Sequence, residues 1–217
     1  RVYCHTLQQY MKVLKHRNNL LKEIQKNPNL KETLFAWDMQ LAEYGEKIIS
    51  FRKNFINNVS AKAAARHTQI SSGGEELSII YVPSADENNF ESKLHSSIER
   101  DIFMGSTSYG PHRDDISFFI NGNDVRVYGS QGQQRTAAIC AKLAEIDIIK
   151  ENTDTSPVLL LDDVLSELDK NRQHMLMDCI NDVQTIITCT GIEDSVTNYA
   201  GNATVFNVNN GVIKRET

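Results

Sequence analysis

Two adjacent carboxylates, Asp162 and Asp163, directly follow the apolar run Val158–Leu161. Such a run is typical of a buried strand in a parallel sheet, which would deliver the two acids to the sheet edge. Carboxylate oxygens are ligands that Mg²⁺ prefers, and a second acid can polarise an attacking water as a general base. We therefore interpret Asp162 as the metal ligand of a nucleotide site and Asp163 as its catalytic base. The simpler alternative is that both acids only cap the next helix.

A second candidate is the Ser/Gly turn SQGQQRT, residues 130–136, which opens onto a predicted helix. Gly129 and Gly132 allow a tight turn and a close approach to a ligand. The Ser130 hydroxyl and the free amides of the helix start can donate to phosphate oxygens, helped by the helix dipole. Alone, such a turn is usually only a helix cap, but together with Asp162 and Asp163 it favours phosphate binding. The phosphate loop GxxxxGK[ST] is absent from the 217 residues.

Charge is distributed unevenly along a chain whose net charge is −5. Residues 1–66 carry twelve Lys/Arg against five Asp/Glu, and the remainder carries eleven against 23. A basic arm on an acidic body is suited to a polyanion such as DNA, although a solvated helical surface would look the same. The four cysteines are widely spaced, which predicts reduced thiols rather than disulfides or a zinc site. No apolar stretch is long enough to cross a bilayer, and no signal-peptide pattern is present.

Residues 1–66 predict a coiled-coil-like helical hairpin whose turn is Asn27–Asn29. Its seam residues recur at steps of three and four: Leu7, Tyr10, Leu14, Arg17, Leu21 and Ile24, then Leu34, Trp37, Leu41, Tyr44, Ile48, Phe51 and Phe55. Arg17 stands where an apolar residue belongs, so it should have a buried or cross-helix acidic partner.

After Gly74 the pattern predicts alternating strands and helices. We expect strands at 77–82, 158–161 and 185–189, helices at 90–103, 133–150 and 170–183, and hairpins at 115–128 and 205–214. The order helix, strand, helix, strand from residue 133 onward implies parallel strands joined by helical crossovers. Residues 166–169, SELD, have a helix-capping sequence that leaves Asp169 well placed for contact across an interface.

These motifs resemble those of ABC-type ATPases: SQGQQR their signature motif, VLLLDD their Walker B strand and SELD their D-loop. Within that superfamily the Asp-Asp pair, the sequence GPHRDD at 110–115, and the arm segments 14–22 and 37–45 resemble the RecF family. The resemblance covers essentially the whole chain, as the C-terminal three-fifths of such a protein. It implies an α/β fold: the C-terminal part of an ABC-type ATPase head with a helical arm. The implied parts are arm 1–70, an α+β lobe 71–129 and the half-head 130–217.

The resemblance also implies site roles and partners. The cofactors would be ATP and Mg²⁺, with Mg²⁺ at Asp162 and the hydrolytic water at Asp163. A head-to-head homodimer would let Ser130, Gln131, Gly132 and Gln133 contact the partner subunit's ATP, with Ser166 and Asp169 at the dimer interface. Such a protein binds single-stranded and gapped DNA in the bacterial cytoplasm, at repair sites on the nucleoid. It works with RecR and RecO to load RecA.

One departure from the pattern concerns the strand after Walker B. Many ABC ATPases place a histidine there, whereas this chain has Thr188-Cys189-Thr190, which makes Thr190 a candidate phosphate sensor. This substitution and the short side chain of Asp163 predict slow, switch-like hydrolysis in the full-length protein. The chain begins with Arg1 in helical sequence, so we interpret it as a fragment. Without a phosphate loop, we expect no ATPase activity from these residues alone.

Two alternatives for the chain remain open, together with two roles for one of its segments. The chain could be the C-terminal head of another SMC-like ATPase, although its helices are short for that class. It could also be a non-catalytic DNA-binding or scaffold module. In GPHRDD, His112 and Arg113 beside Asp114 and Asp115 could form a structural ion network or link the signature helix to a DNA surface.

Overall fold

The computed structural model describes residues 1–71, 73–153, 155–190 and 203–215. Two compact units interleave along the chain. The first combines Arg1–Asn58 with Ile79–Ser117, and the second combines Val59–Ser78 with Phe118–Thr217. No helix among the described residues is long and apolar enough to cross a membrane.

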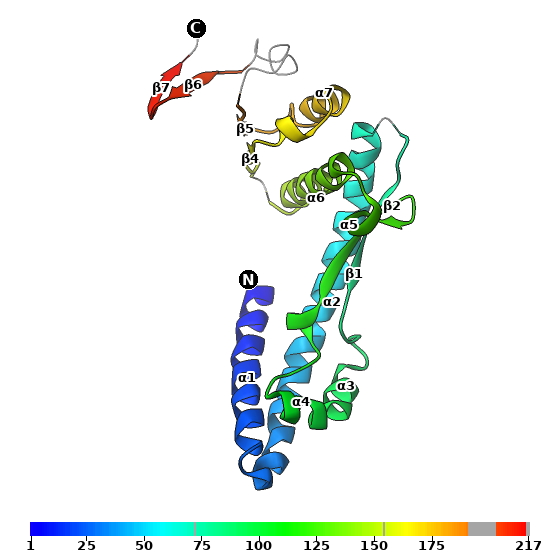
Figure 1. Ribbon diagram of the computed structural model, residues 1–217, viewed down its shortest axis with the longest axis vertical. Coiled ribbons are helices and arrows are strands. Elements are labelled where there is room, and N and C mark those ends of the chain that lie inside the picture. The colour runs from blue at the N-terminus through cyan, green and yellow to red at the C-terminus, as the bar shows by residue number, and fades with distance from the viewer. Residues whose placement is uncertain (72, 154, 191–202, 216–217) are drawn as a thin grey trace. The chain divides into compact units, whose positions relative to one another are not determined.

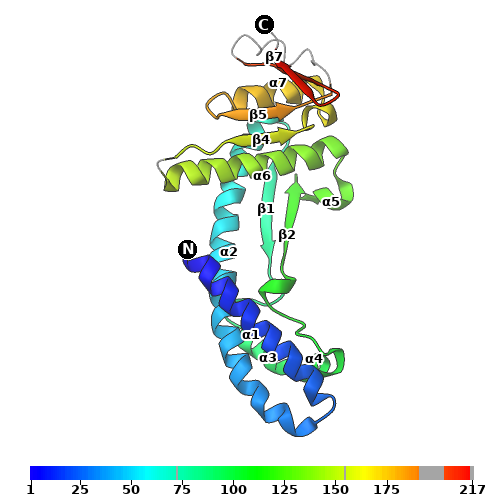
Figure 2. The same ribbon diagram turned by 90° about the vertical axis from the view of Figure 1, so that its left-hand side faces the viewer.

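The predicted helical hairpin is confirmed. Helix α1 (Val2–Ile24) and the first part of α2 (Leu34–Ile70) lie side by side, joined by the 3-10 helix η1 (Pro28–Thr33) (Figures 1 and 2). The predicted seam is buried at most of its positions, but it is wrong at Phe51 and Phe55, which are 42% and 46% exposed. Helix α1 has 23 residues and α2 has 37, so α1 pairs with only part of α2. Phe51 packs edge-on against Tyr3 of α1, and the buried face of α2 continues through Ile49, Ile56, Val59 and Ala63.

Arg17 has the acidic partners that the sequence requires. It is fully buried, and its Nε donates to Asp38 Oδ1 at 2.6 Å. Its Nη1 donates to Asp101 Oδ2 and to Thr107 Oγ1, each at 2.8 Å. Burial raises the pKa of Asp38, and the Arg17 guanidinium opposes that shift. One cation thus joins α1, α2, α4 (Ile98–Met104) and the segment that follows α4.

Between residues 90 and 128 the structure differs from the prediction in two places. The helix expected at 90–103 is two helices, α3 (Phe90–Ser96) and α4, because the Ser97 hydroxyl between them bonds Leu94 O and the Asp101 carboxylate. The second predicted hairpin strand, 124–128, is mostly the short helix α5 (Val125–Tyr128). Asp124 accepts a hydrogen bond from Arg126 N and so caps this helix.

The hairpin itself is confirmed but short. Strand β2 (Asp115–Ile120) pairs antiparallel with the two-residue β3 (Asn123–Asp124), and β1 (Leu77–Val82) completes the sheet in the order β1-β2-β3. Asn121 and Gly122 have positive φ in the turn, as the Asn-Gly sequence predicts.

Two residues of the segment Gly110–Asp115, His112 and Asp114, form a structural hydrogen-bond network. His112 Nε2 lies 3.1 Å from Thr107 O, which can only accept, so Nδ1 accepts the Tyr10 hydroxyl at 2.7 Å. The Asp114 carboxylate accepts from Ser84 N at 2.8 Å and also from the Tyr81 hydroxyl. Arg113 differs from both because it is exposed.

The second unit contains the predicted parallel pair. Strands β4 (Leu159–Asp162) and β5 (Thr185–Thr188) are parallel, and the connection between them contains the 3-10 helix η3 (Leu165–Glu167) and α7 (Lys170–Cys179) (Figure 2). Helix α6 (Gln131–Asn152) precedes β4. Strands β6 (Phe206–Asn209) and β7 (Val212–Arg215) form the predicted terminal hairpin.

The prediction of a buried strand at 158–161 is correct for only one of its two faces. Leu159 and Leu161 are buried, whereas Val158 and Leu160 are 49% and 69% exposed. Successive side chains of a strand point to opposite faces. The described residues therefore bury one face of β4 and leave the other face open.

The buried ion cluster at Arg17 generates a stability prediction. Arg17→Met should lower the free energy of unfolding by about 3–5 kcal/mol, because Asp38 and Asp101 would be left without their cation in the interior. The measurement is chemical denaturation followed by circular dichroism. The matched control is Lys31→Met, which removes an exposed ion pair to Glu99 and should cost less than about 1 kcal/mol. Equal losses for the two variants would contradict the assigned role of Arg17.

Candidate nucleotide site

The carboxyl ends of β4 and β5 bring Asp162 and Thr188 together. These two residues are register partners in the parallel pair. The Thr188 hydroxyl donates to Asp162 Oδ1. The backbone N–H of Asp163 donates to Thr188 O and Thr188 Oγ1, each at 3.1 Å. Both acids are exposed, so their carboxylates face solvent at the edge of the sheet, as predicted.

Asp163 makes a sharp turn immediately after the strand. Its φ is +51°, a left-handed conformation that is uncommon for a residue other than glycine and that Asp adopts more readily than most. The following turn is closed by the Ser166 hydroxyl, which donates to Asp163 O at 2.9 Å. Ser166 thus supports the backbone of the acid pair and is itself exposed.

The sheet edge that carries Asp162 and Asp163, called the acid edge below, offers few protein ligands for Mg²⁺. No group of three or more His, Cys, Asp or Glu side chains with metal-binding geometry occurs among the described residues. Mg²⁺ is commonly held by one or two carboxylates with substrate phosphates and water completing its shell. Asp162, with one oxygen already engaged by Thr188, fits the part of a single carboxylate ligand.

The turn at Ser130 is a complete capping box at the start of α6. Ser130 Oγ accepts from Gln133 N at 3.2 Å, and Gln133 Oε1 accepts from Ser130 N at 2.9 Å. A hydroxyl that accepts through its oxygen can still donate its proton to a ligand. Ser130 and Gln131 are exposed, so the start of α6 is open to an anion from outside the chain.

The two glycines of this turn have different roles. A Cβ on Gly129 would lie 2.5 Å from Val125 O, so packing within the chain requires glycine there. A Cβ on Gly132 would meet Arg172 Nη1 at 3.7 Å, which is an ordinary contact. The chain itself therefore does not require glycine at 132, which is consistent with a close approach by an external group.

The predicted D-loop residue Asp169 caps α7. Its Oδ1 accepts from Arg172 N at 3.0 Å, and its side chain is 63% exposed. Gln173 Nε2 donates to Leu165 O at 2.7 Å and to Leu168 O at 3.1 Å. Asp169 is therefore held in an exposed position on a turn that α7 itself stabilises.

Two residues of the site were missed in the sequence. Thr188, rather than Thr190, contacts the acid pair. Thr190 is exposed and lies two residues beyond the end of β5. Arg172 is the second missed residue, and it supports the turn at Ser130. Its Nη1 donates to Thr136 Oγ1 at 2.9 Å, and Thr136 donates to Gly132 O at 2.7 Å. The register of a parallel pair could have identified Thr188, but a long-range contact such as that of Arg172 has no local signal.

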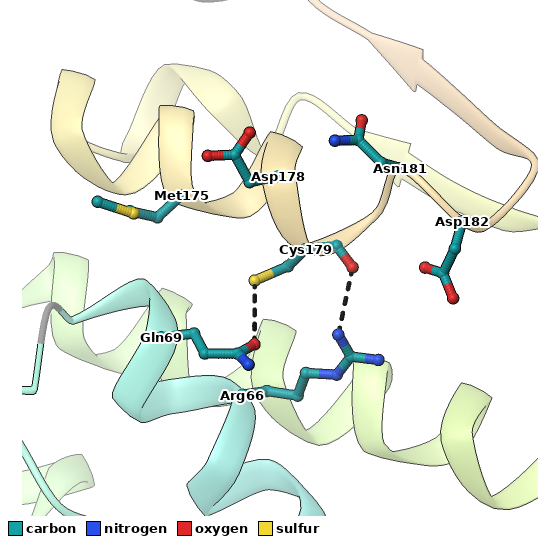
Figure 3. A pocket seen from close by; sticks show the side chains of 7 residues that line it. All are labelled: Arg66, Gln69, Met175, Asp178, Cys179, Asn181 and Asp182. Atoms are coloured by element: carbon teal, nitrogen blue, oxygen red, sulfur yellow. Dashed lines mark hydrogen bonds between the residues drawn. The ribbon is translucent and has the colours of Figure 1, made fainter.

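A separate pocket of about 460 Å³ lies beside the end of α7 (Figure 3). Arg66 donates to Cys179 O at 3.3 Å and pairs with Asp147 at 2.6 Å, while Cys179 Sγ contacts Gln69 Oε1 at 3.5 Å. Burial raises the pKa of the Cys179 thiol, so this cysteine is a poor nucleophile. The pocket joins the end of α2 to α7 and contains none of the predicted site residues.

Sequence comparison finds homologues along the whole chain. No protein-family model matches it. A DNA replication and repair protein RecF of Lachnoclostridium phytofermentans is 50% identical over 215 residues, which are 99% of this chain and 60% of that protein. The corresponding protein of Lachnospira eligens is 47% identical over 218 residues, with 100% and 60% covered. The chain thus spans about three-fifths of the length of these relatives.

Comparison with solved structures finds proteins of the same name as the sequence comparison does. A structure described as the recombination mediator protein RecF-ATPrS in the RecFOR pathway matches with a TM-score of 0.80 at 37% identity, covering 99% of this chain and 59% of that one. A RecF-ATP structure matches with a TM-score of 0.79 at 36% identity. The fold is therefore the C-terminal part of an ABC-type ATPase head with a coiled-coil-like helical hairpin arm. Within that class the chain belongs to the RecF family, as its C-terminal portion.

The capping box generates a prediction about the Ser130 side chain. Ser130→Ala should lower the free energy of unfolding by about 1 kcal/mol, whereas Ser130→Gly should cost only a few tenths. The reason is that glycine leaves the cap amides open to water, while alanine offers neither an acceptor nor the backbone freedom. Urea denaturation of the two variants measures the difference. Equal stability of Ser130→Ala and the parent protein would show that the hydroxyl does not cap the helix.

Proposed function

We propose that this chain is part of a DNA replication, repair and recombination protein whose dimerisation is gated by ATP. The observation that carries the proposal is that the chain presents two exposed half-sites. One is the acid edge at Asp162 and the other is the capped turn at Ser130. The names of the relatives and the RecF structures determined with ATP and ATPrS support it.

In this proposal the two half-sites serve different nucleotides. Asp162 would hold Mg²⁺ beside the subunit's own ATP, and Asp163 would orient the hydrolytic water. The turn residues Ser130, Gln131, Gly132 and Gln133 would bind the γ-phosphate held by the partner subunit, because they carry amides and a hydroxyl at a helix N-terminus. Ser166 and Asp169 would lie at the dimer interface. Thr188 is better placed than Thr190 as the hydroxyl near the phosphate, because it already contacts Asp162.

The proposed biological role follows the family. The protein would act at single-strand gaps on the bacterial nucleoid in the cytoplasm, and with RecR and RecO it would help to load RecA. The name of the RecFOR pathway in the matched structure supports this assignment. Hydrolysis would be slow and would reset the dimer rather than drive rapid turnover.

An exposed basic stripe on α1 supports DNA binding. Positions spaced by three and four residues on one face of α1 and at its two ends are all exposed: Arg1, His5, Gln8, Lys12, Lys15, Asn19, Lys22 and Lys26. Within the described residues, none of these lysines forms an ion pair, and Glu23 is the only acid of the helix. Lys12 and Lys22 are about 15 Å apart along the axis. A cationic row of this length can meet several phosphates of a duplex.

The trans arrangement can be tested by complementation in the full-length protein. Ser130→Arg should block the turn, and Asp162→Ala should remove the metal ligand, so neither variant alone should dimerise with ATP and Mg²⁺. A mixture of the two should dimerise, because one of its two composite sites retains an intact acid edge and an intact turn. Sedimentation velocity with and without nucleotide measures the dimer.

Two results would refute this arrangement. A mixture no better than its components would contradict a site built in trans. Equal magnesium-dependent ATP crosslinking of the Asp162→Ala variant and the parent protein would favour a non-catalytic scaffold.

The α1 stripe generates a second prediction for the full-length protein. Replacing Lys12, Lys15 and Lys22 by Gln should reduce the slope of log affinity against log salt by about 0.9 per lost phosphate contact. ATP affinity should not change. The matched control replaces Lys31, Lys47 and Lys53 by Gln, which removes the same charge from lysines already paired with acids. Fluorescence anisotropy over a salt series measures both, and equal slopes would exclude the stripe as the DNA surface.

A further inference from the structure

A charged cluster contacts the turn at residues 130–133, called the signature turn below. The nucleotide chemistry proposed above does not use this cluster. Glu75, in the segment between α2 and β1, accepts from Gln133 Nε2 at 2.8 Å. Its two carboxyl oxygens lie 3.2 and 3.4 Å from Arg172 Nη2. The side chains of Glu75 and Arg172 are each only 17% exposed, so water screens their attraction less than it would at the surface.

Glu75 determines which way the Gln133 amide points. Gln133 uses Oε1 to accept from Ser130 N and Nε2 to donate to Glu75. The two ends of an amide differ only in being acceptor or donor, so the carboxylate at one end favours the orientation that completes the capping box at the other. The geometry of the turn at Ser130 therefore depends on a charge outside the turn.

Arg172 links this cluster to the D-loop, residues 166–169. Its backbone N–H is capped by Asp169, and its Nε lies 3.3 Å from Asp169 Oδ2. Its Nη1 reaches Thr136, whose hydroxyl donates to Gly132 O. One guanidinium thus contacts the D-loop cap, the signature helix and Glu75, using the fixed fork of donors that lysine lacks.

The last turns of α2 close the cluster from another side. His67 is fully buried, and its Nε2 lies 3.6 Å from Glu75 Oε2 and has no hydrogen-bond partner among the residues that the structure describes. Burial lowers the pKa of His67. Contact with Glu75 opposes this shift and the nearby Arg172 adds to it, and the net lowering favours the neutral form of His67 at physiological pH. The charged groups of the cluster are then Glu75, Asp169 and Arg172, and Arg172 is the cation that pairs with Glu75.

We propose that Glu75 and Arg172 are positioning residues that lock the signature turn and the D-loop into one geometry before a second subunit binds. This inference rests on the proposed function, in which both segments face the partner subunit. A binding surface made of two segments is most effective when their relative geometry is already set, because less conformational freedom is lost on association. Neither residue lies at the acid edge of β4, so the pair should affect dimerisation and leave the subunit's own ATP affinity unchanged.

The test uses the full-length protein with Glu75→Gln and Arg172→Lys. Each change keeps a polar side chain of similar length but removes the charge of Glu75 or the fork of Arg172. We expect ATP-dependent dimerisation to weaken by about tenfold, the effect of losing a hydrogen bond to a charged group. ATP affinity of the monomer, measured below the dimerisation concentration, should match that of the parent. If Glu75→Gln does not fold, Arg172→Lys decides.

The matched control is Asp147→Asn, which weakens the partly buried Arg66–Asp147 ion pair between α2 and α6 in the same unit. Asp147 is 14 residues beyond Gln133, about 21 Å along α6, so its loss should lower the melting temperature without weakening dimerisation. Equal weakening by Asp147→Asn, or normal dimerisation of both test variants, would overturn the inference alone. Failure of the parent protein to dimerise with ATP would refute the proposed function, and the inference with it.

Discussion

The cost of removing a charge from water organises both units of this protein. In the first unit Arg17 is fully buried, and the surrounding chain supplies Asp38 and Asp101 from two other helices to compensate it. In the second unit the same cost keeps an acid at the surface. The apolar part of β4 ends where Asp162 begins, and the acid remains exposed at the sheet edge. Glu75 and Arg172 lie between these cases, partly buried and paired with each other.

The groups proposed to bind nucleotide or to face the partner subunit lie at the end of a strand and at the starts of two helices. Parallel pairing sets Asp162 opposite Thr188, and the left-handed turn at Asp163 ends the strand there. Ser130 and Asp169 are each helix caps, and both remain exposed. Exposed caps and exposed acids are suited to ligands that arrive with another subunit. This exposure is what the proposed site, composed across two subunits, requires.

Features that depend on neighbours in the sequence were predictable. The helical hairpin, the Asn121-Gly122 turn, the helix starts at Ser130 and Asp169 and the parallel pair all follow from periodicity, turn chemistry and capping. The errors occur where spacing or strand propensity was used alone and another interaction decided the structure. Phe51 and Phe55 fit the seam by spacing, but they are exposed because the buried face of α2 passes to Ile49, Ile56 and Val59 instead. The segment 125–128 has strand-forming residues, yet a cap at Asp124 starts a helix.

The sequence by itself determined the residue types of both proposed half-sites and their order along the chain, because a strand end, a helix cap and a carboxylate pair are local patterns. It also required that Arg17 have an acidic partner. Only the tertiary structure decided which residues meet: Thr188 at Asp162, Asp101 at Arg17, and Arg172 with Glu75 at the signature turn. The physical reason is that hydrogen bonds and ion pairs act over a few ångströms in space, and folding brings together groups that lie tens of residues apart in the chain.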